Sequence, residues 1–217
     1  MPESFYTDKM LVIGGHSRSV GKTSLAVDLM RAFPQVTWTA VKITQYGHGV
    51  CSINGENCGC TPEEHTASLD EDRDRSGTTD TSRFLAAGAR RALWLRAKQG
   101  RLAEGLPMLR EALVALDSRN GEFTIVESNS LLKYLRPRLY LVVLDAETPD
   151  FKDSAREVLD RADAFVLRAA LDTTKWQQVA PKLLAGRANF LQSLGQALPK
   201  ALRNFVEERL FWTQFTH

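Results

Sequence analysis

The sequence predicts an α/β fold, a three-layer α/β/α arrangement with a mainly parallel sheet. Three observations support this prediction. Apolar, β-branched runs that are typical of strands recur along the chain, segments with helical spacing of apolar residues lie between them, and 217 residues suit one domain of ordinary size. Strands that alternate with helices favour parallel pairing, because each return to the same end of the sheet needs a crossover. We therefore expect a single domain over residues 1–217.

Six strands are expected, each as a short apolar run. The first two are "KMLVIGG" (9–15) and "VTWTAVKIT" (36–44). The other four are residues 92–97 and the runs "EFTIVES", "RLYLVVLDA" and "ADAFVLRAA". Together they supply the apolar strands that a sheet buried on both faces requires.

Helices are expected between these runs. Leu25, Leu29 and Phe33 share one face after Lys22, and a second face carries Leu102, Leu106, Leu109, Leu113 and Leu116. Asp80 is expected to cap a short helix that Gly88 ends, and residues 153–161 form another. Residues 187–217 are expected to be a helical tail, in which Pro199 starts a second helix or kinks the first. Packing on the sheet is its ordinary role, and a groove for a partner is the rarer one.

Residues 46–78 differ from the rest because Gly, Asn, Cys, Asp and Arg dominate there. We expect a long inserted loop, which in a compact domain is usually functional or disordered. The charged run "DEDRDRS" (70–76) is typical of a solvated loop, although Arg73 or Arg75 could reach a terminal phosphate as a transition-state charge.

The overall composition excludes several classes of protein. The net charge is +2, from 28 basic and 26 acidic residues, which is too balanced for a dedicated nucleic-acid binder. No apolar run approaches the roughly 20 residues that cross a bilayer, and the first residues do not resemble a signal peptide. We expect a cytoplasmic protein with no nucleic-acid or membrane partner.

The segment "GGHSRSVGKTS" (14–24) is the strongest functional signal. It directly follows the first strand and directly precedes a helix, an arrangement that turns backbone N–H groups toward a phosphate. Lys22 would supply a charge to the β- and γ-phosphates, and the Thr23 hydroxyl would bind Mg²⁺. The usual pattern has four residues between its two glycines, whereas five lie between Gly15 and Gly21, and a purely structural glycine turn is the alternative.

The nucleotide-binding residues expected from this loop form one continuous set: Gly15, His16, Ser17, Arg18, Ser19, Val20, Gly21, Lys22, Thr23 and Ser24. His16 is expected to pack on the loop or contact phosphate rather than bind a metal.

This loop, with Val20 before the second glycine, resembles the phosphate loops of dethiobiotin synthetase and the cobyrinic acid a,c-diamide synthases. These enzymes share a broad class with the molybdopterin-guanine-dinucleotide biosynthesis adaptor, the B protein of that pathway. Ser17 stands where the ParA-like members of the class carry a lysine. The resemblance implies an ATP- or GTP-binding α/β protein, often dimeric.

A second segment, "TDTSRFLAAGA" (79–89), resembles the adaptor's Lys-Asp-Ser/Thr … Arg … Ala-Gly-Ala segment. The matching positions are Asp80, Thr81 or Ser82, Arg83 and Ala87-Gly88-Ala89, and Lys42 lies near the end of the strand that precedes them. Thr79 departs where the adaptor tends to carry lysine. The histidines that follow the adaptor's second strand are absent, and only His48 stands nearby.

Carboxylates at strand ends are the candidate magnesium ligands. Glu127 follows an apolar run, and strand-end side chains of an open α/β sheet lie on the ligand-binding edge. It would hold magnesium or orient water, or else be a solvated loop residue. Asp145 is a weaker candidate by the same logic. Asp80 is either a magnesium ligand or the helix cap. The Asn-Lys-x-Asp motif that reads guanine is absent after "AFVLRAAL", so guanine specificity is unsupported.

All three cysteines lie within ten residues. Cys51, Cys58 and Cys60, with His65, could supply three thiolates and an imidazole to tetrahedral Zn²⁺. An iron–sulfur cluster with a fourth ligand from elsewhere is the less favoured metal centre, and a loop of reduced, unligated thiols is the plain alternative. The odd number of cysteines argues against a disulfide framework.

Three functions remain open at this stage. The first is a magnesium-dependent nucleotide-binding protein, a slow NTPase that controls a protein partner or serves cofactor or metal-centre biosynthesis, with Lys22 and Glu127 as its catalytic residues. The second is an ATP-dependent synthetase or kinase that acts on a small metabolite. The third is a non-catalytic, metal-binding scaffold.

Overall fold

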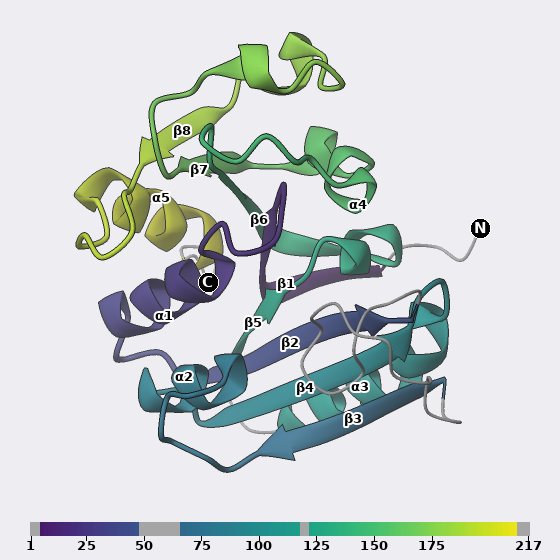
Figure 1. The fold of residues 1–217 in the computed structure, drawn as a ribbon. Helices are drawn as coiled ribbons and strands as arrows, with labels where there is room; N and C mark the ends of the chain where they lie inside the picture. Colours follow the sequence, from purple (N-terminus) through teal and green to yellow (C-terminus); the bar gives the residue numbers. More distant parts are fainter. Residues whose placement is uncertain (1–4, 48–65, 118–121, 212–217) are drawn as a thin grey trace. The chain divides into compact units, whose positions relative to one another are not determined.

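The computed structural model describes residues 5–47, 66–117 and 122–211, which contain eight strands, coloured along the chain in Figure 1. In hydrogen-bonded order the strands are β3-β4-β2-β5-β1-β6-β7-β8. The pairs β1–β6, β2–β4, β6–β7 and β7–β8 are parallel, and β3–β4 is antiparallel. The predicted α/β fold with a mainly parallel sheet is therefore confirmed.

The strands are β1 Phe5–Gly15, β2 Trp38–Tyr46, β3 Ala67–Asp72, β4 Arg91–Lys98, β5 Phe123–Glu127, β6 Leu135–Leu144, β7 Ala164–Leu167 and β8 Ala188–Leu191. The α-helices are α1 Lys22–Ala32, α2 Asp80–Ala86, α3 Leu102–Asp117, α4 Asp153–Arg156 and α5 Lys200–Leu210. Short 3₁₀ helices are η1 Ser130–Lys133, η2 Leu159–Arg161, η3 Thr173–Lys175 and η4 Pro181–Leu183.

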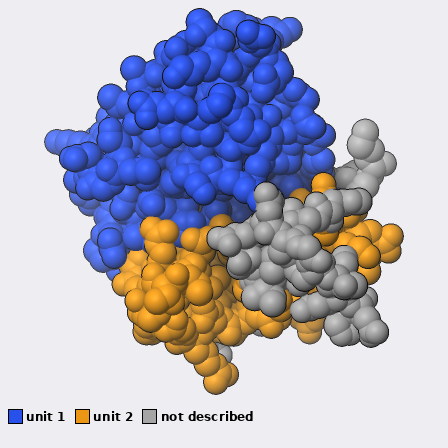
Figure 2. Space-filling view, in the orientation of Figure 1, with its two compact units in different colours: residues 1–34, 127–217 blue, residues 35–126 orange. Residues whose placement is uncertain are grey.

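Contacts divide the chain into two compact units, shown in blue and orange in Figure 2. The first unit comprises residues 1–34 and 127–217, and the second comprises residues 35–126. The glycine-rich loop and Glu127 both belong to the first unit.

The core of the first unit is centred on the parallel pair β1 and β6. Leu11, Val12 and Ile13 of β1 are completely buried, as are the apolar residues 141–143 of β6. Such continuous apolar runs are typical of parallel strands that are covered on both faces. Helix α1 packs on β1, and α5 contacts both β1 and β6. This buried pair fixes the end of β1, from which the glycine-rich loop leaves.

The second unit contains the parallel pair β2–β4 and the antiparallel neighbour β3. Helix α2 packs on β2 and β4, whereas α3 packs on β3 and β4. Strand β3 shows that the expected loop over 46–78 was wrong at residues 67–72, whereas residues 73–78 are irregular as expected. Its acidic residues pair across to β4, with Glu71 bound by both Arg91 Nε and Nη2 at 2.8 Å and Asp70 bound by Arg96 at 2.8 Å. A charged edge strand lacks the apolar run that was used to find strands.

The expected helical tail is also wrong in its first part. Residues 188–191 form β8 beside β7, and the helix begins only at Lys200, with Pro199 as its N-cap. The 153–161 helix is split into α4 and the 3₁₀ helix Leu159–Arg161. Asp80 is not a cap, because Thr79 accepts a hydrogen bond from Ser82 N at 3.1 Å and Ser82 Oγ accepts one from Thr79 N at 2.8 Å. Asp80 is instead the first residue of α2.

Within the described ranges, no helix is long and apolar enough to cross a membrane.

Candidate nucleotide site

The loop between β1 and α1 is sharply turned. Ser19 has φ 55°, and Gly21, the N-cap of α1, has φ 87°. Both lie in the left-handed region, which glycine adopts without the steric cost that a side chain brings. The helix starts at once, since Leu25 N donates to Gly21 O at 3.0 Å. The N-terminus of an eleven-residue helix therefore begins at the loop, where the positive end of the helix dipole favours an anion.

The start of the loop is locked by Asn129. Its Oδ1 accepts from Gly15 N at 2.9 Å, and its Nδ2 donates to Gly15 O at 2.9 Å. Gly14 is required here because a Cβ atom would lie 2.4 Å from both Asn129 Oδ1 and the Tyr140 hydroxyl. Asn129 was not predicted from the sequence, although its position two residues after Glu127 at the end of β5 was a usable signal.

Lys22 and Thr23, the two functional side chains expected from the motif, both contact protein atoms. Lys22 Nζ donates to the carbonyl of Ser17 at 2.8 Å and so folds back across its own loop. Thr23 Oγ1 donates to Glu127 Oε2 at 2.7 Å. Thr23 and Glu127 are only 8% and 4% exposed, so this hydrogen bond is shielded from water. The structure thus brings Thr23 and Glu127, two residues that the sequence proposed for one site, into direct contact.

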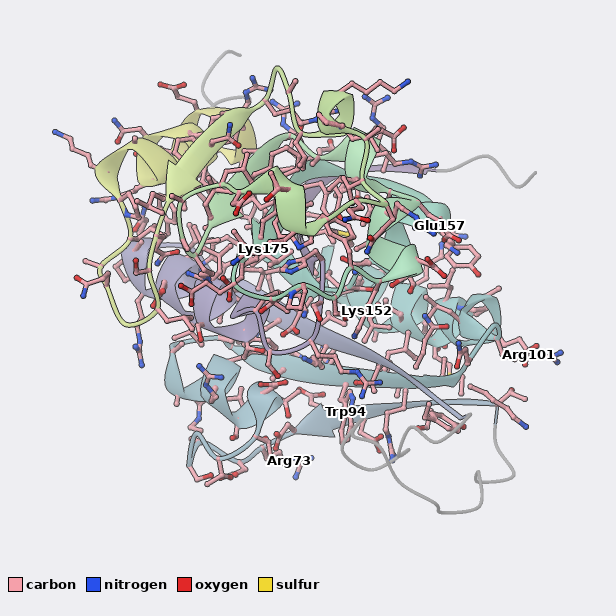
Figure 3. The ribbon with its side chains drawn as sticks, turned by 45° about the horizontal axis from the view of Figure 1, so that its top comes forward. Arg73, Trp94, Arg101, Lys152, Glu157 and Lys175 are labelled. Carbon is pink, nitrogen blue, oxygen red and sulfur yellow. The ribbon has the colours of Figure 1, made fainter. Side chains whose placement is uncertain are left out.

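A segment after β6 lies against the other side of the loop. Ser17 Oγ donates to Asp150 Oδ2 at 2.6 Å, and Lys152 N donates to His16 O at 2.8 Å (Lys152 is labelled in Figure 3). Asp145, a weak magnesium candidate from sequence, instead accepts from Glu147 N at 3.1 Å and Thr148 Oγ1 at 3.3 Å in a local turn. The segment 145–152 therefore holds the loop in place through its contacts with His16 and Ser17.

His16 is packed as a buried aromatic residue, against Phe151 and Trp176 rather than against other residues of the loop. Its ring centroid lies 5.2 Å from that of Phe151 and 4.9 Å from that of Trp176. Its Nε2 lies 3.2 Å from Thr148 O, and Nδ1 lies 3.5 Å from Val143 O. Burial lowers the pKa of His16 below its ordinary value of 6.5, because the charged imidazolium would lose hydration. The ring is therefore neutral near pH 7, and its role is to hold the loop on the segment after β6.

Arg168, directly after β7, holds the far end of the loop. Its Nη2 donates to Gly21 O at 2.6 Å and its Nε donates to Val20 O at 3.2 Å. Arg168 was not predicted as a site residue from the sequence, in which this strand end only lacks a guanine-reading motif. A basic residue after a buried strand gives no signal by itself, because the carbonyls that it meets are invisible in the sequence.

The remaining predicted residues are placed as follows. Arg18 and Ser19 are exposed, Val20 is buried, and Ser24 is half-buried on α1. Asp80 belongs to the second unit, where Lys42 Nζ lies 2.8 Å from Asp80 Oδ2 and Arg83 Nη1 lies 3.7 Å from Asp80 Oδ1. Arg75, also in that unit, donates to Leu85 O at 2.9 Å.

The proposed metal ligands Cys51, Cys58, Cys60 and His65 lie outside the described residues, as does His48. The cysteine site therefore stays a sequence prediction. Within the described ranges, no group of three or more His, Cys, Asp or Glu residues is arranged to hold a metal ion.

Comparison with known proteins gives no family. No protein-family model matches the chain, and no curated protein matches it. Among solved structures, HypB from Helicobacter pylori in complex with nickel aligns at 15% identity over 95% of this chain and 90% of that chain, with a TM-score of 0.49. LpxK from Aquifex aeolicus in complex with ATP aligns at 16% identity over 87% of this chain and 55% of that chain, with a TM-score of 0.45. Neither similarity is close enough to assign a function.

The class of protein follows from the chain's own architecture. A buried strand, a glycine-rich loop ending in Gly-Lys-Thr and a helix follow one another on a mainly parallel sheet. This combination is typical of α/β folds that carry a phosphate-binding loop.

Proposed function

We propose that the chain binds a nucleoside triphosphate together with Mg²⁺ and hydrolyses it slowly, acting as an adaptor or in the biosynthesis of a cofactor or metal centre. The observation that supports this most is the buried hydrogen bond from Thr23 Oγ1 to Glu127 Oε2 at 2.7 Å. It joins the residue after the loop lysine to a strand-end carboxylate, which are the two residue types that would hold Mg²⁺ beside a bound phosphate.

The residues present fit Mg²⁺. This ion takes oxygen ligands, keeps several waters, and is bound by one or two protein groups plus phosphate oxygens. Thr23 supplies a hydroxyl oxygen and Glu127 a carboxylate, adjacent to each other and largely buried. Bound there, Mg²⁺ would neutralise charge on the phosphates. Glu127 would hold the ion or orient the attacking water.

Lys22 would supply the main protein charge. Its ammonium group now contacts the carbonyl of Ser17, within the loop that would surround the phosphates. Exchanging one neutral carbonyl for phosphate oxygens is favourable because the ammonium group then gains an attraction to negative charge in addition to its hydrogen bond. Catalysis in such a site is mostly positioning and electrostatic stabilisation, to which the amides at the start of α1 also contribute.

Several finer assignments belong to this proposal. Either ATP or GTP is accommodated by it, since the strand end at Arg168 carries no Asn-Lys-x-Asp motif. Membership of the dethiobiotin synthetase and molybdopterin adaptor class is supported by the loop pattern with Val20 before Gly21. We also propose that the protein forms a homodimer, binds a protein partner and lies in the cytoplasm.

A titration with fluorescent ATP and GTP analogues, with and without Mg²⁺, tests the proposal. Lys22→Ala should abolish binding, whereas Lys182→Ala, which removes an exposed lysine of the same unit, should leave it unchanged. Retained affinity in Lys22→Ala would contradict the whole site assignment. Phosphate release that requires an added small metabolite would instead point to the synthetase or kinase class.

The cysteine prediction needs a separate test. Metal analysis of anaerobically purified protein should find Zn²⁺ at a level that Cys58→Ser reduces. Equal metal content in the two proteins would contradict the predicted cysteine site and, with it, the hypothesis that the protein is a metal-binding scaffold.

A further inference from the structure

Arg168 is a buried cation that contacts backbone rather than a carboxylate. Only 7% of the residue is exposed, and its guanidinium reaches two consecutive carbonyls of the loop, those of Val20 and Gly21. The fork of an arginine matches paired oxygens, and here the pair is supplied by the main chain. Burying a charge is costly unless it is well hydrogen-bonded, so this placement constrains the loop strongly.

Because peptide groups are planar, the contact with the two carbonyls also sets the direction in which the neighbouring loop N–H groups point. In a planar trans peptide the C=O and the following N–H point in opposite directions. Val20 C=O shares its peptide with Gly21 N–H, and Gly21 C=O shares its peptide with Lys22 N–H. No cis peptide occurs among the described residues. Because both carbonyls face Arg168, the N–H groups of Gly21 and Lys22 are turned away from it, as the start of an anion-binding helix requires.

The other side of the guanidinium is fixed by Gln192, directly after β8. Arg168 Nη1 donates to Gln192 O at 3.0 Å and to Gln192 Oε1 at 3.1 Å. Gln192 Nε2 in turn donates to Asp28 Oδ2 on α1 at 2.9 Å. The ends of β7 and β8 are thereby connected to both the loop and its helix. The network allows the guanidinium little freedom to leave the two carbonyls.

Gly21 permits this close approach. A Cβ atom at this position would lie 2.9 Å from Arg168 Nη2 and 2.7 Å from Leu194 Cδ2. The second glycine of the motif is therefore needed both for its positive φ and for the space that Arg168 fills.

We infer that Arg168 is a positioning residue of the nucleotide site, which orients the Gly21 and Lys22 amides toward the phosphates by holding the Val20 and Gly21 carbonyls. This inference rests on the proposed function and adds to it a residue that does not contact the nucleotide. The positive charge behind the loop also polarises both peptides, which strengthens their N–H groups as donors.

The test compares Arg168→Met with Arg187→Met. Arg187 is a matched control in the same unit, because it too clamps carbonyls, donating to Ala162 O at 2.7 Å, to Leu183 O at 3.3 Å and to Asp160 O. The probes are a fluorescent nucleoside triphosphate and inorganic pyrophosphate as its competitor. Thermal unfolding of each variant is measured in parallel, so that lost stability and lost affinity are separated.

Arg168→Met should weaken both probes by the same factor, roughly tenfold or more, because charge-assisted hydrogen bonds that orient the amides are lost. Arg187→Met should keep wild-type affinity even where its stability falls. Arg168→Lys, which keeps the charge without the fork, should recover part of the affinity and serves where the methionine variant does not fold.

Wild-type affinity in the Arg168 variants, or an equal loss in Arg187→Met, would overturn the inference and leave the proposed function standing. A loss for the triphosphate without a loss for pyrophosphate would also overturn it, since the role assigned to Arg168 concerns phosphate. If wild-type protein bound neither probe, the proposed function itself would fail.

Discussion

Replacing Thr23 by valine tests the paired hydroxyl and carboxylate at the head of α1. Valine has almost the same shape, so the substitution removes the donor to Glu127 without opening a cavity. The lost bond is a hydrogen bond to a charged group that is 4% exposed, for which a cost of about 1.5–3 kcal/mol is expected. For a chain of this size that corresponds to a fall in Tm of roughly 3–12 °C.

Two assays separate the structural and functional parts of this effect. Denaturant unfolding followed by circular dichroism measures the stability loss, and nucleotide titration at several Mg²⁺ concentrations measures the role in metal binding. Thr23→Ser is the matched control, since it keeps the hydroxyl and should restore both quantities. A valine variant whose affinity rises with Mg²⁺ as steeply as that of the serine variant would refute the assignment of Thr23 to the metal.

Three further predictions concern single contacts. Gly21→Ala should reduce stability and nucleotide affinity more than Gly186→Ala. Both glycines have positive φ, 87° and 74°, but of the two only Gly21 has neighbours within 4 Å of an added Cβ. Equal losses, measured by unfolding and by nucleotide titration, would contradict this. Asp80→Asn should cost less than about 1 kcal/mol, since its pair with Lys42 is 40% exposed on the aspartate side. Thr79→Ala should cost about 1 kcal/mol through the lost cap, and the reverse order in denaturation would contradict this ranking. Burial lowers the pKa of His16, so as the pH falls below about 6.5 the unfolded protein binds a proton at His16 before the folded protein does. The stability of the wild type should therefore fall with decreasing pH more steeply than that of His16→Gln, by up to about 1.4 kcal/mol per pH unit. Identical slopes in unfolding measured from pH 7 to 5 would contradict this.

The sequence predicted those elements whose apolar composition or spacing indicates that they are buried. Strand β1 and helix α1 were found because one is a continuous apolar run and the other repeats apolar residues at helical spacing. The order of strand, glycine-rich loop and helix then predicted that Lys22 and Thr23 lie at the start of the helix. Glu127 was chosen by its position after an apolar strand, and the structure places it beside Thr23.

Elements stabilised by partners distant in sequence were missed. Strand β3 is held by acidic side chains that meet arginines of β4, and its own composition resembles a loop. Strand β8 is four residues long and alternates between half-buried and exposed positions, so the spacing of Phe190, Leu191 and Leu194 suggested a helix instead. Only pairing with β7 makes these residues a strand.

The supporting residues of the site were missed for the same physical reason. Asn129 and Arg168 act on backbone atoms of the loop across more than a hundred residues of sequence. Backbone carbonyls and amides have no sequence signature, and any residue can supply them. Motif spacing therefore predicts the groups that would face a bound phosphate but not the groups that hold the loop in shape.

A crystal structure with Mg²⁺ and a non-hydrolysable ATP or GTP analogue tests the central claim most directly. We expect terminal phosphates enclosed by residues 15–22, with Lys22 moved from the Ser17 carbonyl onto phosphate oxygens. The ion is expected beside Thr23 and Glu127. Nucleotide bound elsewhere, or a loop that keeps the Lys22–Ser17 contact while nucleotide is bound, would refute the proposed site.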